Sequence, residues 1–427
     1  MKYQFFILFF FVANLFYAQP GNLEVQLFNL PDVQFKKINA PEGFTSAYEL
    51  KIKQPIDHQN PDKGHFYQRV FLTHKSFDSP MVICTEGYQR PRNRMYELTQ
   101  LLGANQLDVE HRYFGNSIPE DINYEYLNLE QATADLHHIN QLFKKIYNGK
   151  WVSTGISKGG QTTIYYRYFY PDDVDVSVPY VAPLNLALEE KRIYEFLDTV
   201  GTKECREKIY DVQKRILGQR EASLLKLHWF NKGAGLEFNY LTEEEAFEYA
   251  VLEYPFSFWQ WGHDCAEIPG PTATLDETLD HFLGISSMDF FADEAMEDYA
   301  SHYWQAGDQM GYYSYKTDDF AGLLQALPMK PNPTAIFMPE RGMEKKFDGK
   351  LPAKVKSWLD NNGNNFIYIN GNSDTWSATA LRRSGNTNAV FFFMANTDHR
   401  RARIKNMNKD EKAKLVATLE EWLGLDI

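Results

Sequence analysis

The sequence predicts an α/β fold, with a mostly parallel central sheet and a large helical cap, on three observations. Strand-like and helix-like segments alternate before about residue 184 and again after residue 327. Residues 185–327 instead contain charged helical runs. A glycine-rich turn carrying a serine stands between a short strand and a helix. We therefore interpret 19–184 and 328–427 as one sheet domain, and 185–327 as a helical cap inserted into it.

The composition allows a large core and argues against one class of partner. The chain has 427 residues, and 15% of them are aromatic, which disfavours disorder. Lys and Arg number 44 against 57 Asp and Glu, a formal net charge of −13. Nucleic-acid binding needs a basic stripe that displaces counterions, so no nucleic-acid partner is expected.

The first residues have the pattern of a targeting segment. Lys2 precedes an almost wholly apolar run, Phe5 to Phe16, and Ala18 offers a small residue for cleavage. This pattern predicts a secretory signal peptide over 1–18. The alternative is a short membrane anchor, but the run is short for a membrane span. We expect a secreted or periplasmic protein without stable membrane insertion after signal removal.

The elements of the sheet domain follow from periodicity. Apolar residues recur at helical spacing from Ala132 to Ile146, and Gly149 follows as a helix stop. A second helix is expected over 160–169, and a last one carries Leu415, Leu419 and Leu423 on one face. Strands are expected at 48–52, 67–73, 81–85, 106–111, 151–154, 174–181, 335–338, 366–369 and 390–393.

The segment 185–327 has a mainly helical sequence pattern. Its charged helical runs cover 189–197, 205–219 and 243–253, and a Pro-Gly-Pro turn follows at 269–271. Loops at the carboxyl ends of parallel strands are where such sheets place their chemistry, so a cap inserted after one strand would cover that edge.

Three cysteines occur, so they cannot form a pure disulfide framework. Cys84 lies in an apolar strand and is expected to be a buried thiol. Cys205 and Cys265 could pair in an oxidising compartment, although spacing alone fixes no connectivity.

The strongest functional signal is Gly155-Ile156-Ser157-Lys158-Gly159. It fits G-x-S-x-G between a strand and a helix, the context of a nucleophile elbow in an α/β-hydrolase fold. The alternative is a plain glycine-rich turn with an N-capping serine. A phosphate-binding loop is excluded, because the Gly-Lys-Ser/Thr ending is missing from 155–162.

An elbow serine needs a base and an acid, which follow it in the order acid, then histidine. Of five later histidines only His399 comes after the final strand candidate, and the others fall in the cap: His228, His263, His281 and His302. Asp374 follows the strand 366–369 by a short polar turn, which favours it as the acid. The other acids before the base are Asp348, Asp360 and Asp398, and Asp398 adjoins His399 too closely to face its ring.

The oxyanion hole should combine the backbone N–H of Lys158 with an N–H from an earlier loop. That loop is expected at Glu86-Gly87-Tyr88, with Tyr88 as the second donor. No metal site and no cofactor are expected: the H-E-x-x-H and C-x-x-C patterns are absent, and the cluster His263-Asp264-Cys265 is weak.

Several stretches resemble the secreted bacterial prolyl tripeptidyl aminopeptidase family of serine peptidases. They are 154–183 around Ser157, the Glu-His-Arg-Tyr-Phe-Gly run at 110–115, the aromatic run at 253–262, Asp374-Thr375-Trp376, and 398–404. Thr375 stands where the family has proline, and Asp398 where it shows Asn or Gly. The resemblance implies that Ser157, Asp374 and His399 are nucleophile, acid and base, and that short peptides ending in proline are released from free N-termini.

Such an enzyme must also read a free ammonium group and limit peptide length. From position and resemblance, Glu86 and Glu253 are candidates to pair with the ammonium, although most acidic residues are solvated surface groups. Trp259 and its aromatic neighbours could wall a proline-sized pocket, or could equally be core. The alternatives are an exported esterase or lipase on the same fold, and a catalytically silent hydrolase-fold binding protein.

Overall fold

The computed structural model describes residues 22–343 and 345–427. The predicted signal peptide lies outside these ranges. Among the described residues, no helix has the length and apolar character needed to cross a membrane.

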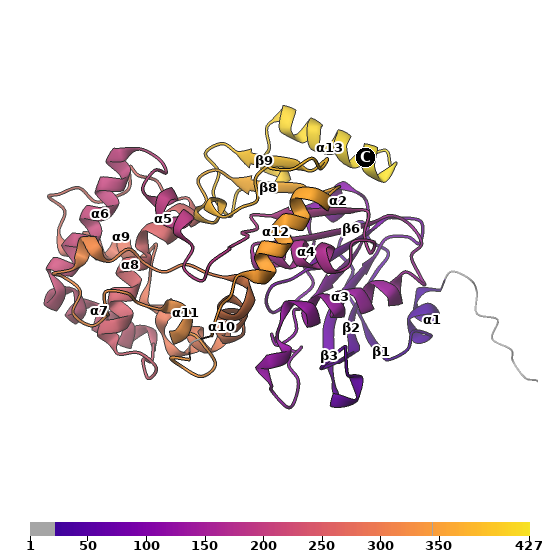
Figure 1. The fold of residues 1–427 in the computed structure, drawn as a ribbon, viewed down its shortest axis with the longest axis horizontal. Coiled ribbons are helices and arrows are strands. Elements are labelled where there is room, and N and C mark those ends of the chain that lie inside the picture. Colours follow the sequence, from indigo (N-terminus) through magenta and orange to yellow (C-terminus); the bar gives the residue numbers. More distant parts are fainter. Residues whose placement is uncertain (1–21, 344) are drawn as a thin grey trace, which may run out of the picture.

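A single twisted sheet organises the described chain (Figure 1). Its strand order is β1-β2-β3-β5-β4-β6-β7-β8-β9. The first three strands pair antiparallel, and β3 also pairs antiparallel with β5. From β5 to β9 every neighbouring pair is parallel. The strands are β1 (Val33–Ile38), β2 (Ser46–Pro55), β3 (His65–His74), β4 (Met81–Thr85), β5 (Asn105–Val109), β6 (Trp151–Ile156), β7 (Val176–Tyr180), β8 (Ile367–Gly371) and β9 (Val390–Met394).

Helices cover both faces of the sheet, as the alternation of buried side chains requires. In β4, Met81 and Ile83 pack toward the side of α3, while Val82 and Cys84 pack toward α2 and α13. Both faces being buried explains why this strand is apolar throughout. The covering helices are α1 (Leu23–Phe28), α2 (Glu97–Leu101), α3 (Leu129–Phe143), α4 (Lys158–Phe169), α12 (Lys350–Asn362) and α13 (Lys409–Leu423). This architecture is the expected α/β-hydrolase fold.

The strand order creates a crevice. The chain passes from β4 to β5 on one side of β4, and then returns to its other side as β6. The loops that leave β4 and β6 therefore diverge at the carboxyl edge of the sheet. In open α/β sheets this switch in direction is where ligands bind.

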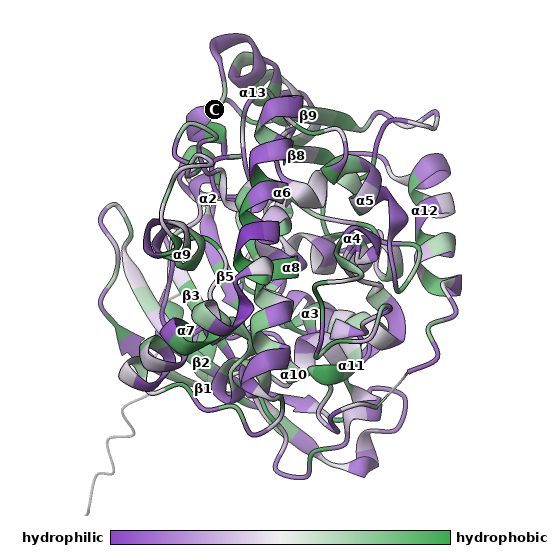
Figure 2. Ribbon diagram, turned by 90° about the vertical axis from the view of Figure 1, so that its left-hand side faces the viewer, coloured by the Kyte–Doolittle hydropathy of each residue, from purple (hydrophilic) through white to green (hydrophobic). Residues whose placement is uncertain are grey.

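A layer of helices inserted between β7 and β8 gathers to one side of the sheet (Figure 1). In α6, Cys205, Ile209, Val212 and Ile216 are buried at helical spacing, and Figure 2 shows hydrophilic residues on the rest of this helix. The α-helices of this layer are α5 (Lys191–Leu197), α6 (Lys203–Gly218), α7 (Arg220–Ala234), α8 (Glu243–Trp261), α9 (Leu275–Leu283), α10 (Asp293–Gln305) and α11 (Pro333–Ile336).

The strand expected at 335–338 is wrong. The segment begins as the short helix α11, because Pro333 occupies its first turn and the Asn332 side chain accepts a 3.1 Å bond from the Ala335 N–H. Phe337 then stacks on Tyr303 of the helical layer, with ring centroids 4.2 Å apart. The segment therefore packs with the helical layer, and the cap boundary at 327 stays a prediction.

Helix α8 is longer than the 243–253 run expected from the sequence. It continues through Pro255 to Trp261. Proline removes one helical N–H and leaves the carbonyl four residues earlier without its partner. That carbonyl, on Val251, instead accepts a 2.8 Å bond from the buried amide of Gln213. The helix therefore survives the proline and reaches the sheet edge.

Two of the three cysteines are paired and the third is free, one of the arrangements that the sequence leaves open. Cys205 and Cys265 form a disulfide that joins α6 to the segment after α8, and Cys84 is a buried free thiol.

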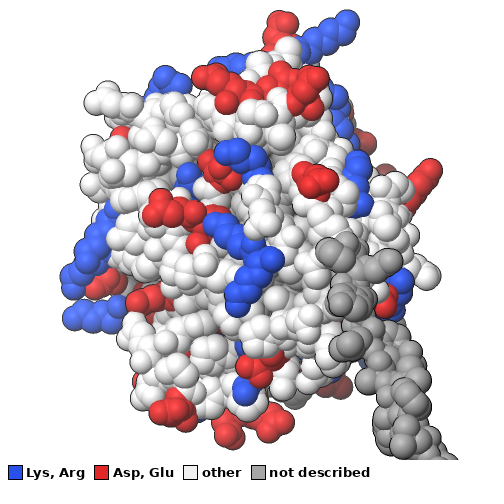
Figure 3. Space-filling view, turned by 90° about the vertical axis from the view of Figure 1, so that its right-hand side faces the viewer, with Lys and Arg blue, Asp and Glu red and all other residues white. Residues whose placement is uncertain are grey.

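On the side of the molecule opposite the cap, Figure 3 shows cationic and anionic side chains interspersed among the residues that are not grey.

Candidate active site

Ser157 occupies a strained turn between β6 and α4. Its φ is 59° and its ψ is −123°, a conformation that costs a non-glycine residue on the order of 1–3 kcal/mol. The flanking glycines are required sterically. A Cβ on Gly155 would lie 2.2 Å from the Gly159 carbonyl oxygen, and one on Gly159 would lie 2.6 Å from that of Thr85. The elbow therefore projects Ser157 from the sheet edge, as the motif predicts.

His399 and Asp374 meet at the same edge. Asp374 follows β8, and His399 lies in the loop after β9. Their Nδ1 and Oδ2 atoms are 2.7 Å apart, and both side chains are buried. The second carboxylate oxygen of Asp374 accepts a 3.1 Å bond from the Trp376 N–H. The acid is thus fixed on both oxygens and can hold the ring in one orientation.

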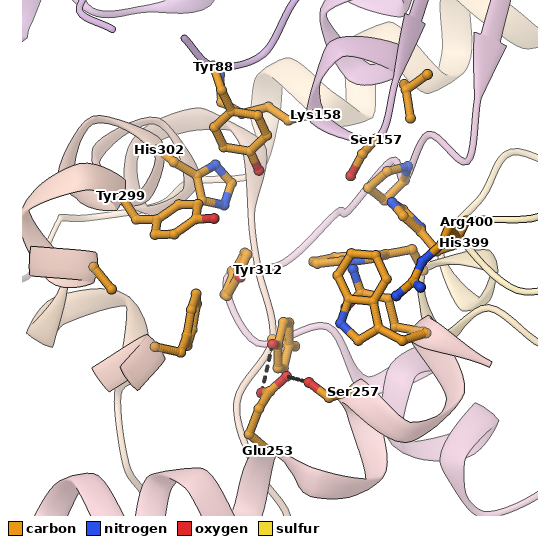
Figure 4. Close-up of a pocket in the computed structure, with 18 of the residues that line it drawn as sticks. Tyr88, Ser157, Lys158, Glu253, Ser257, Tyr299, His302, Tyr312, His399 and Arg400 are labelled. Atoms are coloured by element: carbon orange, nitrogen blue, oxygen red, sulfur yellow. Dashed lines mark hydrogen bonds between the residues drawn. The ribbon is translucent and has the colours of Figure 1, made fainter. Parts of the chain in front are cut away.

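Ser157 and His399 line one cavity of about 750 Å³, which we call the Ser157 cavity. Figure 4 shows the two side chains on the same side of it. Within residues 22–343 and 345–427, no hydrogen bond joins the serine hydroxyl to the imidazole. Catalytic hydrogen bonds are often long in ligand-free enzymes and tighten when substrate binds.

The loop after β4 packs directly on the elbow. A Cβ on Gly87 would lie 2.6 Å from the Lys158 side chain and 2.8 Å from the Gly159 nitrogen. Glycine is therefore needed for this approach, which brings Tyr88 and Lys158 to the same wall of the Ser157 cavity. These are the two residues expected to supply oxyanion N–H groups.

The Lys158 side chain is buried behind this wall. Its Nζ donates a 2.7 Å bond to the Gly87 carbonyl and lies over the rings of Tyr88 and Phe114. Burial lowers the pKa of its ammonium group well below the usual range. The side chain therefore fastens the loop to the elbow and does not offer a free cation to the cavity.

Glu253 lies across the cavity from Ser157 (Figure 4). Its carboxylate accepts bonds of 2.9 Å each from Ser257, Tyr313 and Tyr315. Burial raises its pKa to about 7. Two of the three donors use Oε2, so Oε1 keeps a free lone pair for a ligand.

The two other residues expected to bind substrate are placed differently. Glu86 lines the cavity, but its carboxylate pairs with Arg90, Arg94 and Tyr96. Trp259 faces away and lines a second cavity within the cap. Trp261, two residues later, lines the Ser157 cavity, with its ring 5.8 Å from the imidazole of His399.

Sequence reasoning missed much of the remaining wall. The run 311–315 brings Tyr312 and Tyr313 into the cavity, and α10 adds His302. Burial lowers the pKa of His302 to about 3, so this imidazole is neutral at physiological pH. The dense Tyr run at 312–315 was the one signal in the sequence that pointed here.

Among residues 22–343 and 345–427, no three His, Cys, Asp or Glu side chains are grouped so as to hold a metal ion. In the cluster 263–265, Cys265 is consumed by its disulfide and offers no thiolate.

Known proteins resemble all or part of this chain. A family model described as PS-10 peptidase S37 matches residues 21–426. Prolyl tri/tetrapeptidyl aminopeptidase of Streptomyces mobaraensis is 31% identical over 415 residues, which cover 96% of this chain and 86% of that protein. Putative serine protease F56F10.1 of Caenorhabditis elegans is 30% identical over 174 residues, 36% of this chain and 32% of that protein.

Proposed function

This chain belongs to the PS-10 peptidase S37 family and is a serine peptidase, and from that premise we propose that it releases short peptides ending in proline from free N-termini. One arrangement carries the proposal. The strained Ser157 and His399 line one cavity with a buried carboxylate, Glu253, at its far side, and Asp374 is hydrogen-bonded to His399 from behind the cavity wall. The relative from Streptomyces mobaraensis, named for prolyl tri- and tetrapeptides, supports the same specificity.

The proposed first step is acylation of Ser157. Its Oγ attacks the scissile carbonyl carbon while His399 Nε2 takes the hydroxyl proton. Asp374 holds Nδ1 at 2.7 Å, which fixes the ring tautomer and stabilises the imidazolium as it forms. The new oxyanion is received by the backbone N–H groups of Lys158 and Tyr88, each worth about 3–4 kcal/mol of transition-state stabilisation.

The second step returns the enzyme to its starting state. The imidazolium of His399 gives its proton to the leaving amine, and the C–N bond breaks. Water then attacks the acyl-enzyme, with the same imidazole as base, and the short peptide leaves with a new carboxylate.

Recognition of the free N-terminus is assigned to Glu253. Its Oε1 has an unused lone pair and faces the same cavity as the nucleophile. An ammonium group there would complete a charge-assisted hydrogen bond in a desolvated site. Glu86 is a weaker candidate, because its carboxylate is already paired with two arginines.

Preference for proline is assigned to the aromatic wall. The ring centroids of Tyr312 and Trp376 lie 5.6 Å apart, and both side chains line the Ser157 cavity. Flat apolar rings suit a rigid pyrrolidine that has no N–H to satisfy.

Export is also part of the proposal. It is supported by the Cys205–Cys265 disulfide, because such bonds persist in oxidising compartments.

The test compares peptides that differ only at their N-terminus. We would measure kcat/KM for Ala-Ala-Pro-p-nitroanilide, its N-acetylated form and p-nitrophenyl butyrate. The free peptide should be cleaved, and acetylation should lower kcat/KM roughly 30-fold or more, the effect of leaving a buried charge unpaired. Ser157→Ala should abolish cleavage. Equal cleavage of the acetylated peptide, or hydrolysis of the ester alone, would refute the proposal.

A further inference from the structure

A second cavity lies in the cap behind the Ser157 cavity. It has a volume of about 500 Å³, and we call it the cap cavity. Its walls come from α5, α6, α8 and the segment 313–320, and they include Leu252, Phe256 and Trp259. Neither Ser157 nor His399 reaches it. Tyr313 is the residue that lines both cavities, so its ring lies between them.

Two stacked rings form the partition between the cavities. Phe256 and Tyr313 lie parallel, with centroids 3.9 Å apart and an interplanar angle of 9°. They are only 2% and 4% exposed. Trp376 packs edge-on against both, at 5.1 and 5.5 Å. We call Phe256 and Tyr313 the aromatic partition.

The aromatic partition is held from the catalytic side. The carbonyl of Phe256 accepts a 2.9 Å bond from Thr375 Oγ1, next to Asp374. The hydroxyl of Tyr313 donates a 2.9 Å bond to Glu253 Oε2. The backbone at Phe256 is thus tied to the loop that carries Asp374, which we call the acid loop, and the Tyr313 ring is tied to the carboxylate that faces the nucleophile. Because the two rings also stack and are almost fully buried, they form a fixed wall.

We propose that the aromatic partition sets the length of the peptide released, by closing the substrate cavity directly behind Glu253. The inference rests on the proposed function, since a fixed length has meaning only when the N-terminus is held. When the N-terminal ammonium group of the substrate is bound at Glu253, a peptide with one more residue before the scissile bond would fit only if that residue passed through the two rings. The cap cavity behind them is the space that such an extension would occupy, and each extended residue needs about 3.3–3.6 Å.

The test is the length profile of cleavage. We would measure kcat/KM for peptide anilides with two to seven residues before the scissile bond, all ending in proline with a free N-terminus. The wild type should show a sharp upper limit. Tyr313→Ala and the double variant Tyr313→Ala/Phe256→Ala should extend that limit by one or more residues. The first peptide that the wild type rejects should gain at least tenfold in kcat/KM.

A matched control separates the ring from its hydroxyl. Tyr313→Phe keeps the aromatic partition but loses the bond to Glu253, so it should weaken binding of free N-termini while keeping the wild-type length limit. Circular dichroism and a thermal melt establish that each variant is folded. If Tyr313→Ala does not fold, Phe256→Ala alone tests the same partition and leaves Tyr313 and its bond to Glu253 in place.

The failures of the two proposals are distinguishable. An active wild type without a length limit, or folded partition variants that keep the wild-type limit, would overturn the length inference and leave the aminopeptidase proposal intact. A wild type that cleaves acetylated and free peptides equally would overturn the aminopeptidase proposal itself.

Discussion

The amine of Lys158 donates a 2.7 Å hydrogen bond to the carbonyl of Gly87. The residue after the nucleophile thereby holds the loop after β4 against the elbow. Its backbone and its side chain act on the same wall: one is expected to supply an oxyanion N–H, and the other fixes the loop that carries Tyr88. The geometry of the proposed oxyanion hole therefore depends on how closely this loop approaches.

Gly87→Ala should damage catalysis more than binding. The added methyl group would lie 2.6 Å from the Lys158 side chain, so the loop must shift away from the elbow. We expect kcat to fall at least tenfold with a smaller change in KM, and stability to drop by about 1–3 kcal/mol. Gly233→Ala is the matched control, because its methyl group would meet nothing within 4 Å and lies in helix α7. Wild-type kcat in folded Gly87→Ala would show that this approach is not needed.

Ser157→Ala should lower kcat by on the order of 10⁴–10⁶ without unfolding the chain. The positive φ of 59° provides an independent readout. Glycine tolerates this conformation and alanine does not, so Ser157→Gly should be equally inactive but about 1 kcal/mol more stable than Ser157→Ala. Thermal melts of the two inactive variants measure the difference. Substantial turnover by either variant would remove Ser157 from the mechanism.

Asp374→Asn should lower kcat by on the order of 10³–10⁴, because an amide cannot hold the His399 ring in the required tautomer. Asp398→Asn is the matched comparison. Asp398 is also buried and adjoins the histidine in sequence, but its carboxylate bonds the N–H groups of Arg400 and Arg401. The Asp398→Asn substitution should therefore lower the free energy of unfolding and leave kcat near the wild-type value. Steady-state kinetics on both variants decide between the two acids, and a larger loss of kcat in Asp398→Asn would reverse the assignment.

The sequence was most informative where local chemistry leaves few choices. The elbow requires glycines around Ser157, and the order of acid and base along the chain leaves His399 as the one late histidine. The pairing of Asp374 with that ring followed from its place at a strand end, and the 2.7 Å contact matches the expectation. The roles of the three residues in catalysis remain predictions for the kinetics above.

Errors arose where a residue's environment is set by distant parts of the chain. Residues 335–338 have strand-like composition, but Pro333 and the Asn332 cap begin a helix there.

Trp259 and Trp261 lie close together in the sequence but face different ways. A step of two residues turns the side chain by about 200° around a helix. Only the tryptophan on the same face as Glu253 and Ser257 can reach the Ser157 cavity. Tyr313 could not be placed at all, because its partners come from α8 and the acid loop.

Reduction of Cys205–Cys265 should loosen the cap and slow the enzyme. The bond closes a loop of 60 residues and stabilises by about 2–4 kcal/mol. It also braces the end of α8, where the Gln260 carbonyl accepts a 3.1 Å bond from the His399 N–H. Melting curves with and without reductant should differ for the wild type and coincide for Cys205→Ser/Cys265→Ser. Cys84→Ala, which removes the buried free thiol, should keep the wild-type response to reductant.

Glu253 should give the enzyme a pH dependence near neutrality. Burial raises its pKa to about 7, so substrate binding through the carboxylate should strengthen as pH rises from 6 toward 8. The peptide α-amino group loses its charge from about pH 8, which sets the upper limit. KM for free N-termini should therefore be lowest near pH 7–8. In Glu253→Gln, kcat/KM should fall roughly 30-fold or more, and the acidic limb of the KM profile should disappear.

Stability supplies the second readout for Glu253. The raised pKa means that the folded state favours the protonated carboxyl group, so the wild type loses free energy of unfolding as pH rises from about 4.5 to about 7. Glu253→Gln has no such group. The stability of the variant relative to the wild type should therefore increase over this interval and level off above it. Chemical denaturation at pH 4.5, 6 and 8 measures the trend. A difference that is flat with pH, together with an unchanged KM profile, would mean that Glu253 does not titrate in the site.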